Sequence, residues 1–322
     1  MEVPIAFFIF RRPEETARVF EQIRKARPPK LFIVADGGRT PEEHEICKKA
    51  RAVAERIDWP CEVKKNYADK NLGCKFRVSS GLDWVFKNAE EAIILEDDTL
   101  PHPTFFRFAE ELLKRFRNEP KVTHISGVNF QQKNSKFRSD ASYYFSRVSQ
   151  IWGWATWRRA WKNYDVFMER WPEIKKNGLL YKIFRDPAIA DYWDYRFSEV
   201  YSNRDSKNPT ETWDSQWVFA CLVNGDLAIN PAVNLVTNIG TGAQGTQTKS
   251  GKEKRLSNIP LTPMEFPLCH PEIIIPDEVA DDYSHWLVWG INRTLRQKVI
   301  SFLKFRLPYF YIVLRRIYRV LR

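Results

Sequence analysis

The 322-residue sequence has no long hydrophobic run, few cysteines and few histidines. No stretch approaches the roughly 20 apolar residues of a membrane-spanning helix, and the first apolar run lacks the preceding basic residues of a secretory signal. The five cysteines are scattered, odd in number and without any C-x-x-C spacing. Neither a zinc site nor a disulfide framework is indicated. These absences predict a cytosolic protein in a reducing compartment.

Acidic residues are outnumbered, but mainly at one end of the chain. The sequence holds 51 Lys and Arg against 40 Asp and Glu, a formal net charge of +11. Nine of the basic residues, and no acidic one, fall in residues 291–322, so residues 1–290 are nearly neutral. A nucleic-acid-binding body would carry its own basic face. We therefore expect no nucleic-acid partner.

Buried strands and helices alternate through the first 126 residues, as in an α/β domain. Strand–helix units of about 30 residues imply right-handed crossovers and a mostly parallel sheet, whose ligands bind beyond the carboxyl ends of its strands. Strands are expected at 3–10, 31–35, 61–65, 92–95 and 122–126, and helices at 13–26, 41–56, 75–86 and from 103 onward.

The second half is less regular. Residues 217–223 predict a buried helix, and a polar stretch covers residues 198–212. Four tryptophans between 152 and 161 could stack on sugar rings, but their helical spacing favours core packing. His102 and His124 lack the spacing of metal ligands and are expected to be structural.

Three acidic residues, Glu96, Asp97 and Asp98, directly follow the apolar run 92–95. Adjacent carboxylates repel one another unless a cation or hydrogen bonds compensate. Solvated surface acids are one alternative; a helix cap is a poorer one, because the next helix begins only near Pro103. At the end of a buried strand, such oxygen ligands suit Mg²⁺ or Mn²⁺, which typically bridge a diphosphate.

This acidic segment resembles the E-D-D variant of the D-x-D motif in GT-A glycosyltransferases. The similarity is closest to family 2 enzymes and the N-acetylglucosaminyltransferase I group, and it covers roughly residues 3–248. Further segments agree in order: FRRPE at 10–14, IVADG at 33–37, NLG at 71–73, WGWATW at 152–157 and WDSQW at 213–217. The resemblance implies a Rossmann-like, mostly parallel sheet flanked by helices. It also implies transfer of a sugar, with inversion, from a nucleotide-diphosphate sugar to a hydroxyl acceptor.

The resemblance also assigns roles to the acids. Asp98 would hold the divalent metal, Mn²⁺ or Mg²⁺, on the diphosphate of the donor. Asp97 would bind the ribose or assist the metal, and Glu96 would touch the donor sugar.

Three further residues would bind the nucleotide. Asp36 would hydrogen-bond the base, and Arg12, together with Arg77, would contact the diphosphate. Taken alone, Asp36 is equally an Asp-Gly turn former, and either arginine is an ordinary surface cation.

Inverting transfer requires a general base that deprotonates the acceptor hydroxyl. Asp214 is the candidate, because the family match includes its position. The alternative is structural: Asp214 falls in the first turn of a helix, after Thr212 as a possible cap, where a carboxylate favours the helix dipole. Both can hold at once.

One position departs from the family. Relatives commonly place a histidine in the loop after the Asn-Ile-Gly segment, and this sequence has Gln247 in its place. If the histidine of relatives helps to hold metal or diphosphate, Gln247 would be a weaker, neutral ligand. The alternative function is therefore a non-catalytic sugar-nucleotide or glycan-binding module on the same fold.

The carboxyl-terminal residues 291–322 form an amphipathic tail. Its apolar residues recur at helical spacing, and the charged residues on the remaining face are all basic. Pro308 is expected to divide two helices. This pattern is typical of helices that lie on an anionic membrane surface. A helix docked on the protein or in a dimer, or a membrane- or RNA-associated scaffold, are the alternatives.

We expect three parts: a GT-A domain at 1–250, an extension at 251–290 and the membrane-associating tail. The protein would sit on the cytosolic face of a membrane. Its partners would be a nucleotide-sugar donor and a glycan or lipid-linked acceptor, in the synthesis of a surface polysaccharide or glycolipid.

Overall fold

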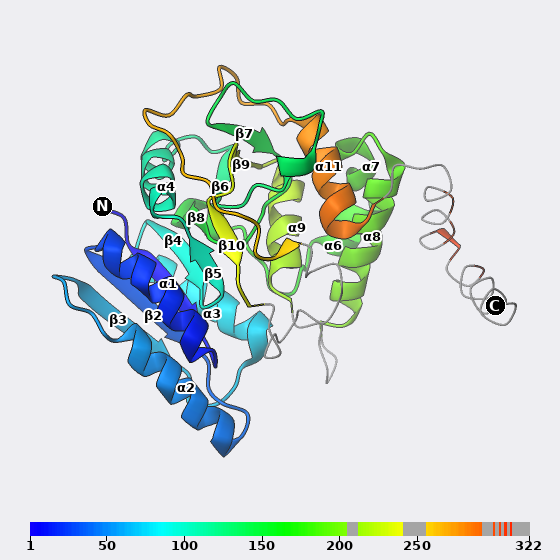
Figure 1. The fold of residues 1–322 in the computed structure, drawn as a ribbon. Coiled ribbons are helices and arrows are strands. Elements are labelled where there is room, and N and C mark those ends of the chain that lie inside the picture. Colours follow the sequence, from blue (N-terminus) through cyan, green and yellow to red (C-terminus); the bar gives the residue numbers. More distant parts are fainter. Residues whose placement is uncertain are drawn as a thin grey trace, which may run out of the picture.

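The computed structural model describes residues 1–204, 212–240 and 256–291, and the single residues 299, 303, 306, 307 and 310. Within these residues, an eight-stranded sheet has the order β3-β2-β1-β4-β8-β6-β9-β7 (Figure 1). Its strands are β1 (Ile5–Ile9), β2 (Lys30–Ala35), β3 (Glu62–Tyr67), β4 (Glu91–Glu96), β6 (Val122–Ser126), β7 (Tyr143–Ser146), β8 (Trp154–Trp157) and β9 (Leu227–Pro231).

The predicted fold class, a mostly parallel sheet flanked by helices, is confirmed. Six of these strands run in one direction, and β7 and β8 run against them. The main flanking helices are α1 (Pro13–Ala26), α2 (Pro41–Ala54), α3 (Gly73–Asn88), α4 (Pro103–Arg115) and α9 (Asp214–Asn224). A proline opens α1, α2 and α4, where the missing N–H costs no hydrogen bond.

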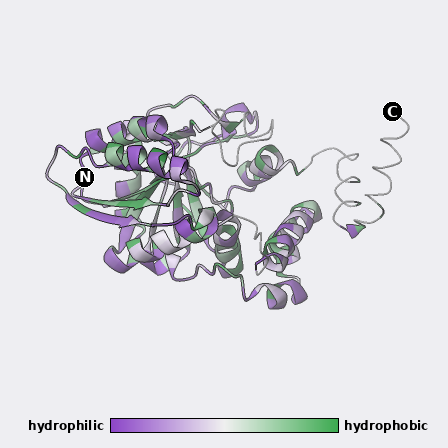
Figure 2. Cartoon of the chain, turned by 90° about the horizontal axis from the view of Figure 1, so that it is seen from below, coloured by the Kyte–Doolittle hydropathy of each residue, from purple (hydrophilic) through white to green (hydrophobic). Residues whose placement is uncertain are grey.

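Side chains of each central strand alternate between two hydrophobic layers. Phe7 of β1 packs with α1 and α4, whereas Phe8 packs with α3 and α9 on the opposite face. This alternation explains the continuous apolar runs of the sequence, because both faces of the sheet are covered. Figure 2 shows hydrophobic colour on the sheet and hydrophilic colour on the outer helix surfaces.

The tryptophan-rich segment differs from the expectation of helical spacing. Residues 154–157 form strand β8, which pairs antiparallel with both β4 and β6. Trp154 therefore packs in one layer and Trp157 in the other. The helix α5 (Arg158–Trp161) begins only after the strand. Because both faces of β8 are buried, its run of large residues does not show the polar alternation that reveals a strand.

Further helices pack beside the sheet around a third hydrophobic cluster. They are α6 (Trp171–Lys176), α7 (Leu179–Ile183), α8 (Pro187–Ser202) and α11 (Glu278–Trp289), and Figure 1 shows α11 next to α7 and α8. Helix α8 runs into the stretch that was expected to be polar and irregular. A short two-stranded sheet pairs β5 (Thr99–Pro101) with β10 (Val236–Asn238).

Residues 256–291 pack on the body of the protein. Phe145 of β7 bridges to Pro276, and Gln131, in the 3₁₀ turn Gln131–Lys133, donates a hydrogen bond to the carbonyl of Ala280 in α11. The predicted domain boundaries stay a prediction.

Most of the tail, including most residues of its predicted amphipathic stripe, lies outside the described residues, as does Gln247. One described tail residue, Arg306, pairs with Asp191 of α8 at 2.7 Å. Among the helices that the structure describes, none is long and apolar enough to cross a membrane.

Candidate active site

The strand order reverses between β1 and β4. The chain adds β2 and β3 on one side of β1 and then returns to place β4 on the other side. In parallel sheets the crevice beyond such a switch point is where ligands bind. Phe8 of β1 pairs in register with Glu96 of β4, so both strands end at the same edge.

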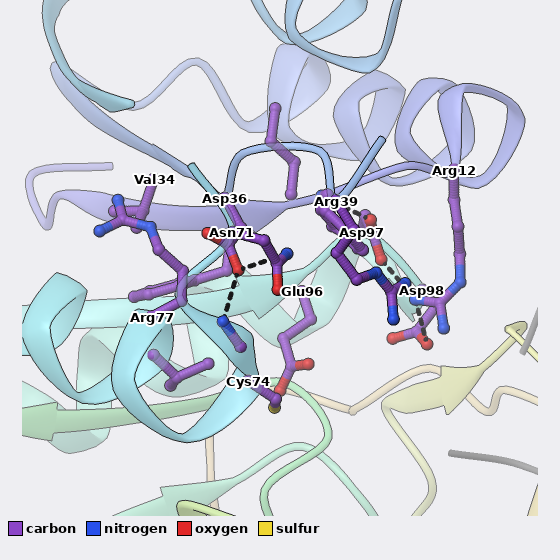
Figure 3. A pocket seen from close by; sticks show the side chains of 15 residues that line it. Arg12, Val34, Asp36, Arg39, Asn71, Cys74, Arg77, Glu96, Asp97 and Asp98 are labelled. Atoms are coloured by element: carbon purple, nitrogen blue, oxygen red, sulfur yellow. Dashed lines mark hydrogen bonds and ion pairs between the residues drawn. The ribbon is translucent and has the colours of Figure 1, made fainter. Parts of the chain in front are cut away.

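A cavity of about 260 Å³ opens at this edge (Figure 3). We call it the first cavity. It brings together six of the seven predicted site residues: Arg12, Asp36, Arg77, Glu96, Asp97 and Asp98. They come from the ends of β1, β2 and β4 and from α3, so the fold gathers side chains that are far apart in the sequence.

Arg12 joins two of the three acids. Its Nη1 lies 2.7 Å from Oδ1 of Asp97 and 2.9 Å from Oδ2 of Asp98. Asp97 Oδ2 also accepts a hydrogen bond of 2.9 Å from the backbone N–H of Phe10. Burial disfavours the charge on Arg12, but the two carboxylates outweigh it and raise the pKa of Arg12. Ion pairs thus link the residues that follow β1 to the residues that follow β4.

Glu96 points away from this group, toward Cys74 of α3 (Figure 3). Burial, and then repulsion from Asp98 and Asp97, raise the pKa of Glu96 to about 8. Burial also raises the pKa of Asp97 to about 6, although Arg12 opposes it. The two buried carboxylates Asp97 and Asp98 and the half-buried Glu96, beside one guanidinium, leave an excess of negative charge, which a bound cation would relieve.

In the described part of the chain, no three His, Cys, Asp or Glu side chains are placed to hold a metal ion. Both Asp97 and Asp98 pair with Arg12, and Asp97 also accepts a hydrogen bond from Phe10. A divalent ion held by Asp98 would therefore have to share that carboxylate with Arg12 and take most of its ligands from a bound diphosphate, as Mg²⁺ commonly does.

Residues 239 and 240, which directly follow β10, lie against Asp98. The N–H of Ile239 donates to the carbonyl of Asp98 at 2.8 Å. A Cβ on Gly240 would lie only 2.3 Å from Asp98 Oδ2. Glycine is therefore required for this approach of the backbone to the carboxylate.

Asp36 lines the first cavity and holds the neighbouring loops by hydrogen bonds. Its Oδ1 accepts hydrogen bonds from the N–H groups of Gly37 and Leu72, both at 2.9 Å, and its Oδ2 accepts from Gly73 N–H and Asn71 Nδ2, both at 3.1 Å. The turn-forming role is thus present. The predicted contact of Asp36 with a base stays a prediction, and the three hydrogen bonds from residues 71–73 place that loop along the cavity.

Arg77, in α3, also lines the first cavity. Its Nη2 donates to the backbone carbonyl of Asn66 at 2.6 Å and to its side-chain oxygen at 2.9 Å. Desolvation lowers the pKa of Arg77, and the nearby Asp36 opposes that shift. Because Arg77 is buried, it is not the ordinary surface cation of the alternative interpretation.

Asp214, the seventh residue, lines a neighbouring cavity of about 420 Å³, which we call the second cavity. Asp214 is the first residue of α9, so its predicted placement in the first turn is correct. Its carboxylate lies close enough to Glu96 to contribute to the raised pKa of that residue. Asp214 thus lies within electrostatic range of Glu96, although the two cavities share no lining residue.

The hydrogen bonds of Asp214 leave one oxygen available. Oδ1 accepts from the hydroxyl of Thr212 and from the N–H of Ser215 at 2.7 Å. Within the described residues, Oδ2 receives no hydrogen bond. A carboxylate fixed through one oxygen and open at the other can accept a proton from a bound hydroxyl.

Most of the tryptophans and both histidines are structural, as expected. Trp154 and Trp157 are almost fully buried. His124 is buried between the carbonyl of Gln150 and the indole N–H of Trp217. His102 caps α4 by accepting from the N–H of Thr104. Trp152 is the exception, because it is half-buried and lines the second cavity.

Several cavity residues were not predicted. Arg39, Asn71 and Cys74 line the first cavity. Asn71 and its loop lay within a motif, but no feature of the sequence connected them to Asp36. Of the residues that line the second cavity, only Asp214 was predicted, because the cavity is assembled from segments near 130, 150, 195, 214, 256 and 288.

Comparisons with known proteins identify no family. No protein-family model matches the sequence, and no curated protein matches it. One similar solved structure, 4-diphosphocytidyl-2C-methyl-D-erythritol synthase from Anaerococcus prevotii, has a TM-score of 0.38 and 9% identity, covering 76% of this chain and 94% of that one. Mouse xyloside xylosyltransferase 1 in its apo form has a TM-score of 0.32 and 11% identity, covering 68% and 81%. These likenesses are too distant to bear on function.

Proposed function

We propose that the protein is an inverting, metal-assisted glycosyltransferase that uses a nucleotide-diphosphate sugar. The observation that carries this proposal is the first cavity at the β1/β4 switch point. It combines a strand-end carboxylate cluster with Arg12 and lies beside a second cavity that holds a candidate base.

The first cavity would bind the donor. Arg12 would face the diphosphate, Asp97 would orient Arg12 or contact the ribose, and Glu96 would touch the donor sugar. Asp36 would hold the 71–73 loop beside the base, and buried Arg77 would add positive potential from behind. A divalent metal on Asp98, Mn²⁺ or Mg²⁺, would neutralise charge that develops on the departing diphosphate.

The second cavity would bind the acceptor. Asp214 Oδ2 would accept the proton of the acceptor hydroxyl as its oxygen bonds to the anomeric carbon. The bond from that carbon to the diphosphate oxygen breaks in the same displacement, and the nucleoside diphosphate leaves. Attack from the side opposite the leaving group inverts the anomeric configuration.

The basic tail would bring this reaction to an anionic membrane. We infer from its sequence pattern that the protein associates peripherally with the cytosolic surface and acts on a glycan or lipid-linked acceptor of a surface polysaccharide or glycolipid.

A thermal-shift panel tests donor binding. The protein would be melted with UDP-, GDP-, CDP- and dTDP-sugars, each with Mn²⁺, Mg²⁺ or a chelator. We expect one nucleotide to stabilise the protein, more strongly with metal, since a ligand that binds the native state raises the melting temperature. Asp98→Asn should remove the metal dependence while Asp140→Asn, an exposed control, retains it. Absence of stabilisation by every nucleotide would count against the proposal.

A further inference from the structure

The second cavity is lined both by aromatic rings and by polar side chains, which include the candidate base. We call these two sets of lining residues the aromatic wall and the polar wall. The aromatic residues are Phe130, Trp152, Tyr192, Trp193, Tyr195 and Trp289, and the polar residues include Ser149, Gln150, Arg196, Glu199, Asp214 and Ser215. Its volume, about 420 Å³, falls in the range of small-molecule sites.

The aromatic wall is held in fixed orientation. Trp152 contacts Phe130 with ring centres 5.8 Å apart and planes at 78°. Trp193 and Trp289 meet at 5.1 Å and 65°, and the indole N–H of Trp193 donates to Nε2 of His285. Rigid aromatic surfaces suit the C–H faces of a sugar ring, which are apolar although the ring edge carries hydroxyl groups.

The polar wall contains a buried donor that lacks a partner. Gln150 is 8% exposed, and its Nε2 has no hydrogen-bond acceptor in the part of the chain that the structure describes. A buried amide without a partner costs free energy, so a ligand that supplies an acceptor oxygen is favoured. An alkyl chain in the cavity would leave this donor unsatisfied.

The charges of the polar wall favour an uncharged ligand. Arg196 is already neutralised, because its Nη1 pairs with Glu199 at 2.7 Å and its Nε donates to the hydroxyl of Ser215 at 3.1 Å. Asp214 places a carboxylate beside the ligand site. A carboxylate on the ligand would lie next to it, and the described lining residues offer no cation other than the already paired Arg196 to balance the two acids.

We propose that the second cavity is a subsite for a neutral sugar ring, which packs on Trp152 and accepts a hydrogen bond from Gln150. This inference deepens the proposed function. Binding of the sugar does not depend on that function, but the interpretation of the bound sugar as the acceptor rests on it. It narrows the acceptor from any hydroxyl compound to an uncharged pyranoside whose free hydroxyl lies at Asp214.

Binding of simple glycosides to the full chain tests the inference. The probes are methyl pyranosides of glucose, galactose, mannose and N-acetylglucosamine, with methyl glucuronide and hexanol for comparison. Saturation-transfer NMR and calorimetry would measure contact and affinity, with and without nucleoside diphosphates. We expect at least one neutral glycoside to bind, with methyl glucuronide about tenfold weaker and hexanol not detectable.

Variants locate the binding. Gln150→Leu and Trp152→Ala should each weaken the glycoside by about tenfold, which corresponds to about 1.4 kcal/mol. Gln132→Leu, a glutamine to leucine change at an exposed position, should leave it unchanged. If Gln150→Leu fails to fold, Trp152→Phe, which keeps an aromatic surface, should bind with an intermediate affinity.

The outcomes separate this inference from the proposed function. Nucleotide binding without any glycoside binding would overturn the sugar subsite and leave transfer to another acceptor possible. Glycoside affinity that is unchanged in both Gln150→Leu and Trp152→Ala would also overturn the sugar subsite. Binding of methyl glucuronide as tight as that of the neutral glycosides would do the same. Glycoside binding that is lost in the variants, without any nucleotide binding, would support the subsite and contradict the proposed transferase.

Discussion

The two cavities are built in different ways. The first is lined mainly by residues at the ends of β1, β2 and β4 and in α3, and most of its charged side chains follow a strand directly. The second is lined by aromatic residues and single polar groups from six separate segments of the chain. The charge at the first cavity is the reason that we propose a metal-bound diphosphate as its ligand. Shape and hydrogen bonding at the second suit one particular acceptor.

Replacement of Asp214 separates the two cavities most strongly. Asp214→Asn keeps the hydrogen bond to Ser215 but removes the base, so sugar transfer should fall by about 10²- to 10⁴-fold. Affinity for the nucleotide should stay at the wild-type level, because Asp214 lies outside the first cavity. Product formation and calorimetry measure the two effects, and Asp140→Asn is the control. Equal loss of nucleotide binding would mean that the cavities do not act separately.

Arg12 tests whether charge holds the first cavity together. Arg12→Gln leaves Asp97 and Asp98 buried without their cation, and such a loss typically costs about 3–5 kcal/mol. Urea unfolding should show this decrease, and nucleotide affinity should fall as well. Arg24→Gln, which breaks a surface ion pair with Glu21, should leave both measurements unchanged. Unfolding at the wild-type urea concentration would contradict the structural role of Arg12.

The tail should affect neither cavity. Replacing Arg315, Arg316 and Arg319 with alanine should weaken binding to vesicles of anionic lipid by about 3 kcal/mol, at about 1 kcal/mol for each cation. Nucleotide affinity should not change. Vesicle flotation at low and at physiological salt measures the effect. Equal binding of the variant would favour a tail that docks on the protein.

Asp281, in α11 and outside both cavities, allows a test of stability against pH. It accepts hydrogen bonds from the Ser146 hydroxyl and the Arg147 N–H, and burial raises its pKa from 3.8 to about 7. Between these values the folded state binds a proton that the unfolded state has lost, so stability should fall as pH rises from about 4 to about 7. One such group contributes a slope of at most about 1.4 kcal/mol per pH unit.

Asp281→Asn should flatten that part of the curve, and Asp140→Asn should not. Urea unfolding across pH 4 to 8 gives the slopes. If both variants follow the wild-type curve, Asp281 ionises as freely in the folded state as in the unfolded state.

The sequence was most informative where local signals suffice. Apolar runs, Pro13, Pro41 and Pro103 predicted the early strands and helices, because such elements are specified within a few residues. The same strands carried Arg12 and the acids to one edge of the sheet. The roles of these side chains nevertheless remain predictions.

The remainder depends on contacts between distant residues. Strand β8 escaped prediction because Trp154 and Trp157 are buried on opposite faces. The amide nitrogen of Gln150, which has no acceptor among the described residues, is recognisable only in the folded structure. Three of the four hydrogen bonds on Asp36 likewise join loops more than 30 residues apart.

The product of the reaction tests the central claim most directly. The protein would be incubated with its stabilising nucleotide sugar, Mn²⁺ or Mg²⁺ and a neutral methyl glycoside, and NMR would give the anomeric configuration of any new linkage. The account predicts a glycoside of inverted configuration that forms only with metal and disappears in Asp214→Asn. A product of retained configuration, or equal product from Asp214→Asn, would contradict it.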